Sequence, residues 1–594
     1  MSITVVRPEV TNMMTDTLSG SPQFPAVSTG VTSSTRDAMD AAVQSLQSRK
    51  EAWVSTPVSE RIKLLDRMMK DSAAIACKWV DMSRQSKGIY ENVHTADEWS
   101  VGPYAVLRNL RGLRRSLHDI NRYGHPGIPG PVITRADGQV VARIFPQTRY
   151  DGIFLSGVTA EVWMQPGVTA AELPRTQAAA YRDNHHEGKV ALVLGAGNYL
   201  AIPAMDILYK LFGEDCVVLL KPNPVNAQLG SLVEECFRAL IEQGFLRIVY
   251  GGAAEGAYLC NHAGVDEIHI TGSDKSFDAI VFGTGPEGAR HKRERNPLLT
   301  KRITAELGNV TPAIVVPGHW SFNDITYQAE HIVTMLAENA GFNCVTTRMI
   351  LQHASWSQRE QLLQEIRRRL SGLPLRTAYY PGAHERHRAF VSAHPEAELY
   401  GKPTAEQLPW TLIAGVNPKN KDDICFTTEA FCSLFAETPI EAKTVPEYIE
   451  RAVEFANEHL WGTLAATLIV HPSSLKDPAV AAAVERAVAA LRYGTIGVNY
   501  WAAASYSMAV APWGAFPGHT IDNIQSGIGV VHNTFMFSRS QKTVLRAPFR
   551  VSPKPIWFET RARAGWKVFP KLVQFEASPS LRKIPAIVWT ALRG

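Results

Sequence analysis

The chain has 594 residues, of which 45% are hydrophobic and 20% charged, and it carries a net charge of +5. This composition is typical of a globular enzyme with two or more domains. Its 42 glycines and 36 prolines are too few for a collagen-like or low-complexity protein. Because no apolar run reaches about 18 residues, we expect no membrane-spanning helix.

The first segment, residues 1–35, is rich in Ser, Thr, Pro and Val and has no long apolar stretch. We expect a disordered leader here and not a secretory signal. The seven cysteines are spread through apolar segments and form no CxxC pair, a pattern typical of the reducing cytosol. We therefore expect a cytoplasmic protein with mostly buried thiols and no metal site.

Helical periodicity comes next along the chain. Thr56-Pro57 has the residue types of a helix start, and apolar residues then recur at helical spacing from Ile62 to Met69. A second helical stretch is expected around residues 99–120. Residues 138–165 alternate in polarity and contain β-branched and aromatic side chains, which predicts an extended bridging hairpin.

From Lys189 onward, short strands and helices alternate. KVALVL and CVVLLK are typical of buried strands, and the helical AIPAMDILYKLF separates them. This order predicts βαβ units and a parallel sheet, which binds nucleotides at the carboxyl ends of its strands. We divide the chain into a leader at 1–35, a cofactor-binding domain at 36–305, a catalytic domain at 306–515 and a C-terminal segment at 516–594.

Three glycine- or lysine-containing strand ends are candidate cofactor contacts, and each also has an ordinary structural explanation. Gly195-Ala196-Gly197-Asn198 is a partial dinucleotide fingerprint, or only a tight turn. Lys221 can reach ribose hydroxyls or a phosphate, or remain a solvated lysine. Gly272-Ser273 allows close approach to a pyrophosphate, or simply caps a helix.

Two further residues are candidates for catalysis. Cys344 follows a helical run and stands among Asn, Gly and Thr, so it is better placed for reactivity than the other six cysteines, although most cysteines are inert. Glu306 interrupts an apolar stretch, where burial would raise its pKa as a general base requires. The alternative for Glu306 is a solvated glutamate at a strand edge.

Together and in this order, these motifs resemble those of the aldehyde dehydrogenase superfamily, over roughly Ala191 to Val531. VDEIHITGS resembles the family's segment before its Thr-Gly-Ser loop, AELGNVTPAIVVP its Glu-Leu-Gly-Gly motif, and NAGFNCVTTR its active-cysteine motif. TTEAFCSLF resembles its Glu-x-Phe motif, and GTIGVNYW and PWGAFPGHTIDNIQSGIG its C-terminal region. The resemblance implies an α/β fold with a parallel-sheet cofactor-binding domain, an α/β catalytic domain and a bridging β-hairpin.

The resemblance also implies roles for single residues. Cys344 would be the nucleophile, Glu306 would activate water, and Asn198 would form the oxyanion hole with the backbone NH of Cys344. The cofactor would be NAD or NADP. The residues expected to bind it are Lys221 and Glu429 at the riboses, Gly272 and Ser273 at the pyrophosphate, and Phe431 near the nicotinamide.

The implied reaction is NAD(P)-dependent oxidation of an aldehyde to a carboxylic acid through a cysteine thioester, in a homodimer or homotetramer that binds no nucleic acid. One alternative is an acylating aldehyde dehydrogenase or fatty-acyl-CoA reductase, because Gly197-Asn198 is similar to the fatty-acyl reductases of this superfamily. The presence of Glu306 favours hydrolysis. The other alternative is an inactive scaffold with a basic binding tail, against which the joint retention of Cys344, Glu306 and Asn198 argues.

The chain also departs from the family pattern. Pro224 stands where the family usually has a carboxylate, which would bond the ribose 2′-hydroxyl and disfavour a 2′-phosphate. The Trp that often precedes the oxyanion asparagine is Gly197. Cys432 and Ser433 replace the glycines that commonly follow Glu-x-Phe.

The basic character of the chain belongs to its C-terminal tail. Residues 539–594 hold twelve Lys and Arg against Glu559 and Glu576, a local balance of +10. Aromatic residues among these charges suit weak contact with an anionic membrane surface. Several prolines argue against a long amphipathic helix, so we favour an extended arm that packs on the protein's own fold or on a neighbouring subunit.

Overall fold

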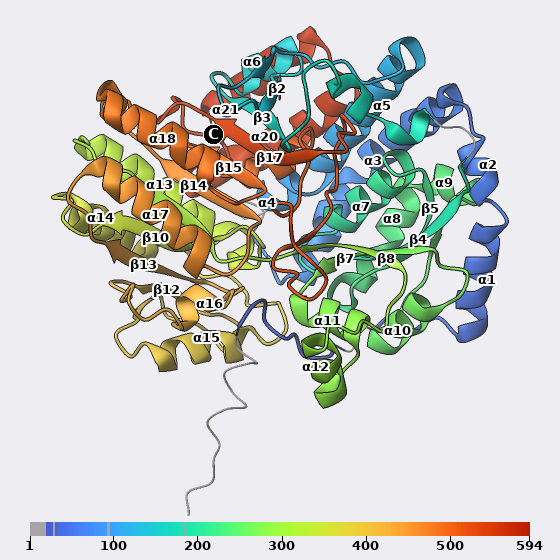
Figure 1. Cartoon of the computed structure of the whole chain (residues 1–594), viewed down its shortest axis with the longest axis horizontal. Helices are drawn as coiled ribbons and strands as arrows, with labels where there is room; N and C mark the ends of the chain where they lie inside the picture. The colour runs from blue at the N-terminus through green and yellow to red at the C-terminus, as the bar shows by residue number, and fades with distance from the viewer. Residues whose placement is uncertain (1–18, 28–29, 92–95, 183–185, 594) are drawn as a thin grey trace, which may run out of the picture.

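The computed structural model describes residues 19–27, 30–91, 96–182 and 186–593. Two sheets of six and eleven strands organise the chain, and they lie side by side in Figure 1 with helices on their faces. This mixed α/β architecture with parallel sheets confirms the predicted fold class.

The six-stranded sheet holds the expected cofactor residues Lys221 and Gly272, and its half of the fold is called the cofactor half below. Its order is β16-β8-β7-β4-β5-β6, and all neighbours are parallel except β16, which runs antiparallel to β8. Its central strands are buried, as their apolar sequences predict. The strands are β4 (Lys189–Leu194), β5 (Cys216–Lys221), β6 (Leu246–Ile248), β7 (Glu267–Gly272), β8 (Arg302–Leu307) and β16 (Gly527–Ile528).

Helices from the first half of the chain pack around this sheet. The predicted helix after Pro57 is confirmed as the 29-residue α3, whereas the stretch expected at 99–120 is divided into α4 and α5 at Gly102. A Cβ at Gly102 would lie 2.1 Å from the Glu98 carbonyl oxygen, so the turn requires glycine. The helices are α1 (Arg36–Gln47), α2 (Lys50–Val54), α3 (Val58–Ser86), α4 (Ala96–Ser100), α5 (Pro103–Tyr123), α7 (Ala201–Phe212), α8 (Gly230–Cys236), α9 (Arg238–Glu242), α10 (Ala253–Asn261), α11 (Asp274–Phe282) and α12 (Gly285–Arg293).

The eleven-stranded sheet has a parallel centre built from the catalytic half. Its order is β1-β2-β3-β17-β15-β14-β9-β10-β13-β12-β11. The strands are β1 (Val132–Thr134), β2 (Val140–Phe145), β3 (Thr159–Met164), β9 (Thr311–Val315), β10 (Thr347–His353), β11 (Glu398–Tyr400), β12 (Trp410–Ile413), β13 (Leu434–Ile440), β14 (Ala465–Ile469), β15 (Thr495–Val498) and β17 (Ser540–Arg546). The helices of this half are α13 (Phe322–Ala337), α14 (Arg359–Gly372), α15 (Ala383–Ala393), α16 (Ile424–Thr427), α17 (Val445–His459), α18 (Pro478–Ala490) and α19 (Ala504–Met508).

The predicted hairpin at 138–165 is present but interrupted. β2 and β3 pair antiparallel, with Val141 opposite Trp163. Between them lies α6 (Arg149–Phe154), which Thr148 and Asp151 begin with a reciprocal capping box. The hairpin joins the larger sheet through β3, which pairs with β17.

The C-terminal segment is built into both sheets. β16 extends the six-stranded sheet, and β17 lies between β3 and β15 in the other. The tail then forms α20 (Ala562–Ala577) and α21 (Ile584–Arg593), so the expectation of an extended arm is wrong, although the expectation that the tail packs on its own fold is right. Pro570 lies inside α20, where the burial of its apolar face compensates for the missing hydrogen bond.

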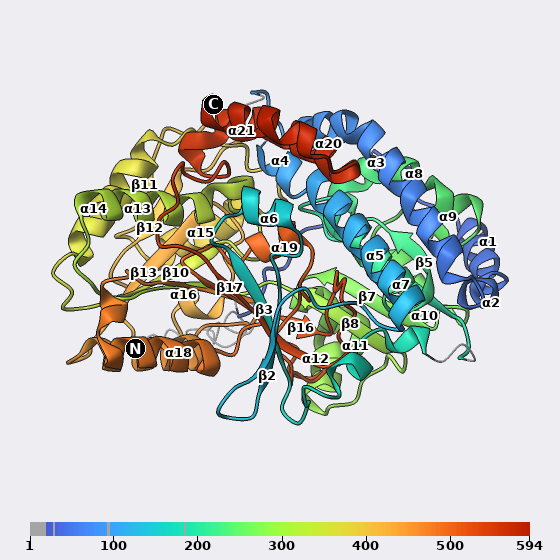
Figure 2. The same cartoon turned by 90° about the horizontal axis from the view of Figure 1, so that it is seen from above.

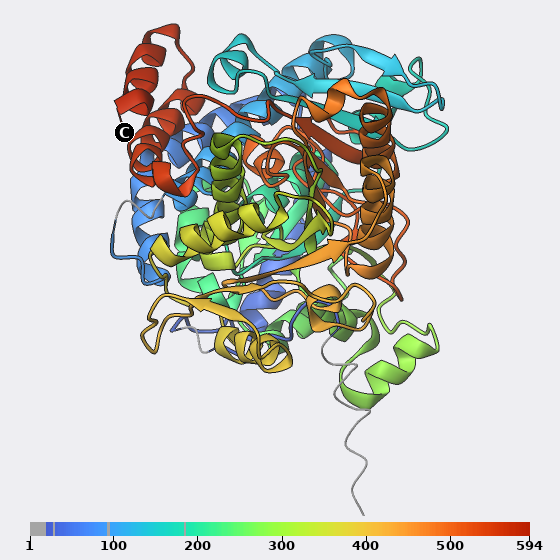
Figure 3. The same cartoon turned by 90° about the vertical axis from the view of Figure 1, so that its left-hand side faces the viewer.

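The two C-terminal helices lie together at one end of the molecule. Figure 2 shows α20 and α21 beside α3 and α4, and Figure 3 shows the same red helices against the blue N-terminal ones. Glu576 of α20 is buried and forms ion pairs with Arg108 at 2.9 Å and Arg111 at 2.8 Å. No helix in the described ranges has both the length and the apolar character needed to cross a membrane.

Part of the expected leader is also packed on the fold. Residues 1–18 lie outside the described residues, but residues 19–27 form hydrogen bonds with both halves of the protein. The backbone of Gly20 pairs with the end of α16, because its NH donates to the Thr427 carbonyl at 2.8 Å. For residues 19–27 the expectation of a disordered leader is therefore wrong.

Candidate active site

Parallel strands bring the candidate residues of the cofactor half to one edge of the sheet. Asn198 follows β4, Lys221 ends β5, Gly272 ends β7, and Glu306 lies near the end of β8. Because β5, β4, β7 and β8 are consecutive parallel neighbours, their carboxyl ends meet at the same edge. Glu306 is fixed in register by β16, where it pairs with Gly527.

Cys344 stands in the loop that follows α13 and leads into β10. Arg348, at the start of β10, holds this loop by donating to the carbonyls of Gly341 and Leu434, the second at 2.9 Å. Sγ of Cys344 lies 3.4 Å from Oε1 of Glu306. The structure thus brings together the thiol and the carboxyl that the sequence marked as candidates, from opposite sheets.

Both groups of this pair have a raised pKa, so each keeps its proton to a higher pH than usual. Burial, with a smaller contribution from the charge of Asp206, raises the pKa of Glu306 to about 8. Burial, and then the neighbouring Glu306 carboxylate, raises the pKa of the Cys344 thiol well above its usual value. At neutral pH the resting site therefore holds a neutral thiol beside a mostly neutral carboxylic acid.

Asn198 lies beside the same loop. Its Nδ2 donates to the Phe342 carbonyl at 3.2 Å, and its side chain is buried. An amide Nδ2 carries two hydrogens, so this bond leaves a second donor. Asn198 and Cys344 line the same cavity, as a shared contact with one reacting group requires.

Sequence analysis missed Glu338 and Asn343, which support the cysteine loop. Nδ2 of Asn343 and the Tyr199 hydroxyl each donate to Glu338 at 2.6 Å, and Oδ1 of Asn343 accepts from the Val345 NH at 3.1 Å. Burial raises the pKa of Glu338 above its usual range. The sequence offered one sign of this role, because Glu338 is an acid six residues before Cys344. The inward orientation of Glu338 depends on the turn at Asn339 and Ala340, where φ is positive.

The expected cofactor residues come from both halves of the fold. Lys221 donates to the Gly251 carbonyl at 2.8 Å, and burial lowers its pKa to about 8. Ser273 caps α11 by accepting from the Ser276 NH at 3.2 Å. On the side of the larger sheet, burial raises the pKa of Glu429 to about 8, and Phe431 packs against Tyr380 with ring centroids 4.9 Å apart.

These residues fit a dinucleotide. Oε1 of Glu429 is buried and has no hydrogen-bond partner among the described residues, so it can accept a bond from a ribose hydroxyl. Gly272 is exposed at the end of β7, and a Cβ there would meet only Ile270, at 3.6 Å or more. The backbone before α11 is therefore open to close approach by a phosphate.

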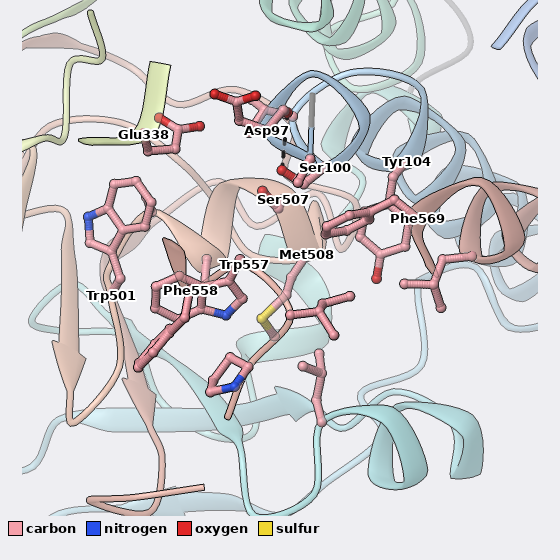
Figure 4. A pocket seen from close by; sticks show the side chains of 18 of the residues that line it. Asp97, Ser100, Tyr104, Glu338, Trp501, Ser507, Met508, Trp557, Phe558 and Phe569 are labelled. Atoms are coloured by element: carbon pink, nitrogen blue, oxygen red, sulfur yellow. Dashed lines mark hydrogen bonds between the residues drawn. The ribbon is translucent and has the colours of Figure 1, made fainter. Parts of the chain in front are cut away.

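An apolar cavity of about 410 Å³ leads away from Cys344. Figure 4 shows its aromatic wall, with Trp501, Trp557 and Phe558 on one side and Tyr104 and Phe569 on the other. Ser100, Asp97 and Glu338 give it a polar strip. The volume is in the usual range for a small-molecule site.

A separate cluster lies away from this site. The ligand atoms of His394, Asp423 and Cys425 are within 4.8 Å of one another. Asp423 already caps α16 and accepts from His394 Nε2 at 3.0 Å, so the fold accounts for this cluster.

The protein is thus of the α/β class, with two sheets that are largely parallel. A cysteine–carboxyl pair lies at the carboxyl end of the six-stranded sheet. Residues 198–396 match the model of the aldehyde dehydrogenase family. An N-succinylglutamate 5-semialdehyde dehydrogenase of Novosphingobium aromaticivorans is 31% identical over 179 residues, which are 30% of this chain and 34% of that protein. The matched part of the chain thus spans about a third of that relative's length.

The solved structures match over more of the chain. A Mycobacterium tuberculosis aldehyde dehydrogenase complexed with NAD+ has a TM-score of 0.57 at 19% identity, and the match covers 88% of this chain and 92% of that one. An NADP-dependent glyceraldehyde-3-phosphate dehydrogenase of Bacillus halodurans, complexed with NADP, has a TM-score of 0.56 at 16% identity, over 86% and 91%. The chain thus has the fold of the aldehyde dehydrogenases over most of its length, and residues 198–396 match the model of that family.

Proposed function

We propose that this protein oxidises an aldehyde to a carboxylic acid with NAD or NADP, through a thioester on Cys344. The observation that carries the proposal is the 3.4 Å contact between Cys344 Sγ and Glu306 Oε1, beside an apolar cavity that Cys344 lines. A nucleophile within reach of a base is the arrangement that covalent catalysis requires.

In the first stage, the thiol of Cys344 gives its proton to solvent, and Sγ of the resulting thiolate bonds to the aldehyde carbon. The free Nδ2 hydrogen of Asn198 and the Cys344 backbone NH would stabilise the oxyanion. When bound, NAD or NADP supplies the acceptor for the hydride that leaves this carbon. The carbon–oxygen double bond re-forms, and Cys344 carries a thioester.

In the second stage, Glu306 in its ionised form removes a proton from a water molecule that attacks the thioester carbon. The bond to Sγ breaks, the thiol regains a proton, and the carboxylic acid leaves. An acylating enzyme would instead release the thioester to coenzyme A. Glu306 beside the thiol supports the hydrolytic outcome.

The test is an absorbance assay for NAD(P)H over a panel of aldehydes, with and without coenzyme A. Cys344→Ser should abolish turnover while cofactor binding is kept, and Cys77→Ser, at an exposed thiol, is the matched control. Full activity in Cys344→Ser would refute the mechanism. Turnover that depends on coenzyme A would favour the acylating reaction instead.

We also propose that the protein forms a homodimer or homotetramer. β1 is an edge strand of the larger sheet and its residues are exposed, Ile133 by 52%. An exposed edge of this kind can pair with a second copy of the chain. Light scattering of the purified protein would give its mass, and a monomer at all concentrations would contradict this assembly.

A further inference from the structure

We propose that the C-terminal helices close the substrate cavity and make the enzyme selective for neutral, apolar aldehydes with a long chain. This inference rests on the proposed function and adds the substrate class. Cys344 and Asn198 stand at one end of the cavity, and Ile587 and Ala591 of α21 line its far side. A substrate that fills this space must carry a hydrocarbon chain from the reacting carbon towards α21.

Three large apolar residues that line the cavity are also exposed, and two of them are on α21. Val588 and Leu592 of α21 are 38% and 58% exposed, and Ile153 of α6 is 48% exposed. Phe569 and Leu572 of α20 form the wall below them, and both are buried. An aldehyde that enters beside α21 contacts apolar side chains before it reaches Cys344. This path favours apolar substrates, because the transfer of apolar surface out of water is favourable.

The charges around the cavity disfavour an anionic substrate. Among the described residues that line it, the two cations are already paired: Arg376 with Asp97 at 2.8 Å, and Lys554 with Glu330. Burial raises the pKa of the lining acid Glu559 to about 7, so a neighbouring carboxylate would be repelled by its ionised form. An aldehyde without a charged group matches this lining.

α21 can be altered without disturbing either sheet. It packs on α20, and Ile587 is its only residue that is buried. Arg561, the residue before α20, also contacts α21, because its guanidinium donates to the Ala591 carbonyl. Substitutions on α21 therefore test the cavity while leaving the Cys344 site intact.

The experiment measures kcat/KM for unbranched aldehydes from two to twelve carbons. In the wild type, each methylene that enters the cavity should raise kcat/KM by at most about fourfold, until the chain reaches α21. Ala591→Trp fills the far side of the cavity and should lower kcat/KM for dodecanal at least about tenfold, with acetaldehyde within about twofold. Ala586→Trp, the same change on an exposed face of α21 outside the cavity, should alter neither.

Two results overturn the inference: a flat chain-length series in the wild type, or equal losses for short and long aldehydes in Ala591→Trp. Absence of turnover with every aldehyde would instead refute the proposed function. Binding of the neutral alcohol dodecan-1-ol, followed by tryptophan fluorescence, then tests the cavity separately from turnover. Binding that Ala591→Trp weakens and Ala586→Trp does not would support an apolar-chain site, and no binding would refute it.

A second inference concerns residues 19–27, which link the two sets of expected cofactor residues. Next to Ser273, the Ser21 NH donates to Oδ1 of Asp274 at 3.2 Å. On the side of the larger sheet, the Glu429 NH donates to the Gly20 carbonyl at 3.0 Å. Figure 1 shows this dark blue segment running between α16 and α11.

The aromatic ring of this segment lies on the proposed nicotinamide side. The centroid of Phe24 is 5.5 Å from that of Phe431 and 4.9 Å from that of Tyr380, and the Arg386 guanidinium lies over its ring. We infer that residues 19–27 act as a strap that competes with the cofactor for contact with these residues. The strap must leave before a dinucleotide can contact both Ser273 and Glu429.

The test compares cofactor dissociation constants by fluorescence titration. Phe24→Ala removes the aromatic contacts and should tighten NAD or NADP binding about two- to tenfold. Gly20→Ala should also release the strap, because φ is +97° there and a Cβ would lie 2.1 Å from Oδ2 of Asp274. Phe322→Ala, at a ring that is 70% exposed, is the control.

Limited proteolysis supplies a readout independent of affinity. Saturating cofactor should expose the strap in the wild type, so cleavage within residues 19–27 should accelerate. Unchanged dissociation constants in both variants, together with cleavage that the cofactor does not accelerate, would refute the strap.

Discussion

The most specific prediction concerns the ionisation of Glu306 and its effect on release of the acid. Because the pKa of Glu306 is about 8, about a tenth of its carboxyl groups are ionised at pH 7 and about nine tenths at pH 9. Because only the ionised form accepts a proton from water, the rate of thioester hydrolysis should rise about tenfold between these two values. Glu306→Gln removes the base, and loss of general base catalysis typically lowers a rate by about 10² to 10⁴.

The assay separates the two halves of the reaction by stopped-flow absorbance. In Glu306→Gln, a burst of NAD(P)H equal to the enzyme concentration should be followed by a stalled steady state, because hydride transfer precedes the affected step. The wild type should show a steady-state rate that rises with pH through about pH 8. The reasoning is refuted by a steady-state rate in Glu306→Gln within twofold of the wild type, or by a flat profile from pH 6.5 to 9.

Three further predictions follow from other parts of the molecule. Asn198→Ala should lower kcat about 10²- to 10³-fold with thermal stability nearly unchanged, as for the loss of an oxyanion donor, and a kcat within threefold would contradict that role. Since Pro224 supplies no carboxylate, KM values for NAD and NADP should be similar, and strict rejection of NADP in the same assay would mean that another group discriminates. Deletion of residues 539–594 removes β17 from between β3 and β15, so we expect loss of the cooperative unfolding transition in circular dichroism, and a cooperatively folded product would contradict it. Membrane contact through this tail stays a separate prediction, and salt-sensitive co-sedimentation of the full chain with anionic vesicles would support it.

The sequence could mark the candidate residues that the fold brings together because its signals are local. Cys344 and Glu306 each stood out against their own neighbours, and the order of strands placed Asn198 and Lys221 at one sheet edge. Glu338 was missed, since nothing in the local pattern shows that the turn at Asn339 directs an acid inward. The local sequence pattern predicts a helix or a strand, whereas the groups that a side chain contacts depend on the whole fold.

The errors at the two ends of the chain have the same origin. Pro570 argued against a helix, but α20 forms because Val568, Phe569 and Leu572 bury an apolar face on the rest of the protein. Residues 19–27 contain no apolar pattern of their own and are ordered by hydrogen bonds to groups more than two hundred residues away. Composition alone could not predict either outcome.

The pairing of Gly527 with Glu306 has a consequence for biosynthesis. β8 is completed by a strand that leaves the ribosome 221 residues later, which at about 5 to 20 residues per second is a delay of about 10 to 45 s. β17 arrives later still, so during this interval the edges of β3, β8 and β15 have no partner. A nascent chain can therefore fold much of its cofactor half early, yet it acquires a fixed Glu306 only near the end of translation. Until then its unpaired strand edges are the part of the molecule most in need of chaperone protection.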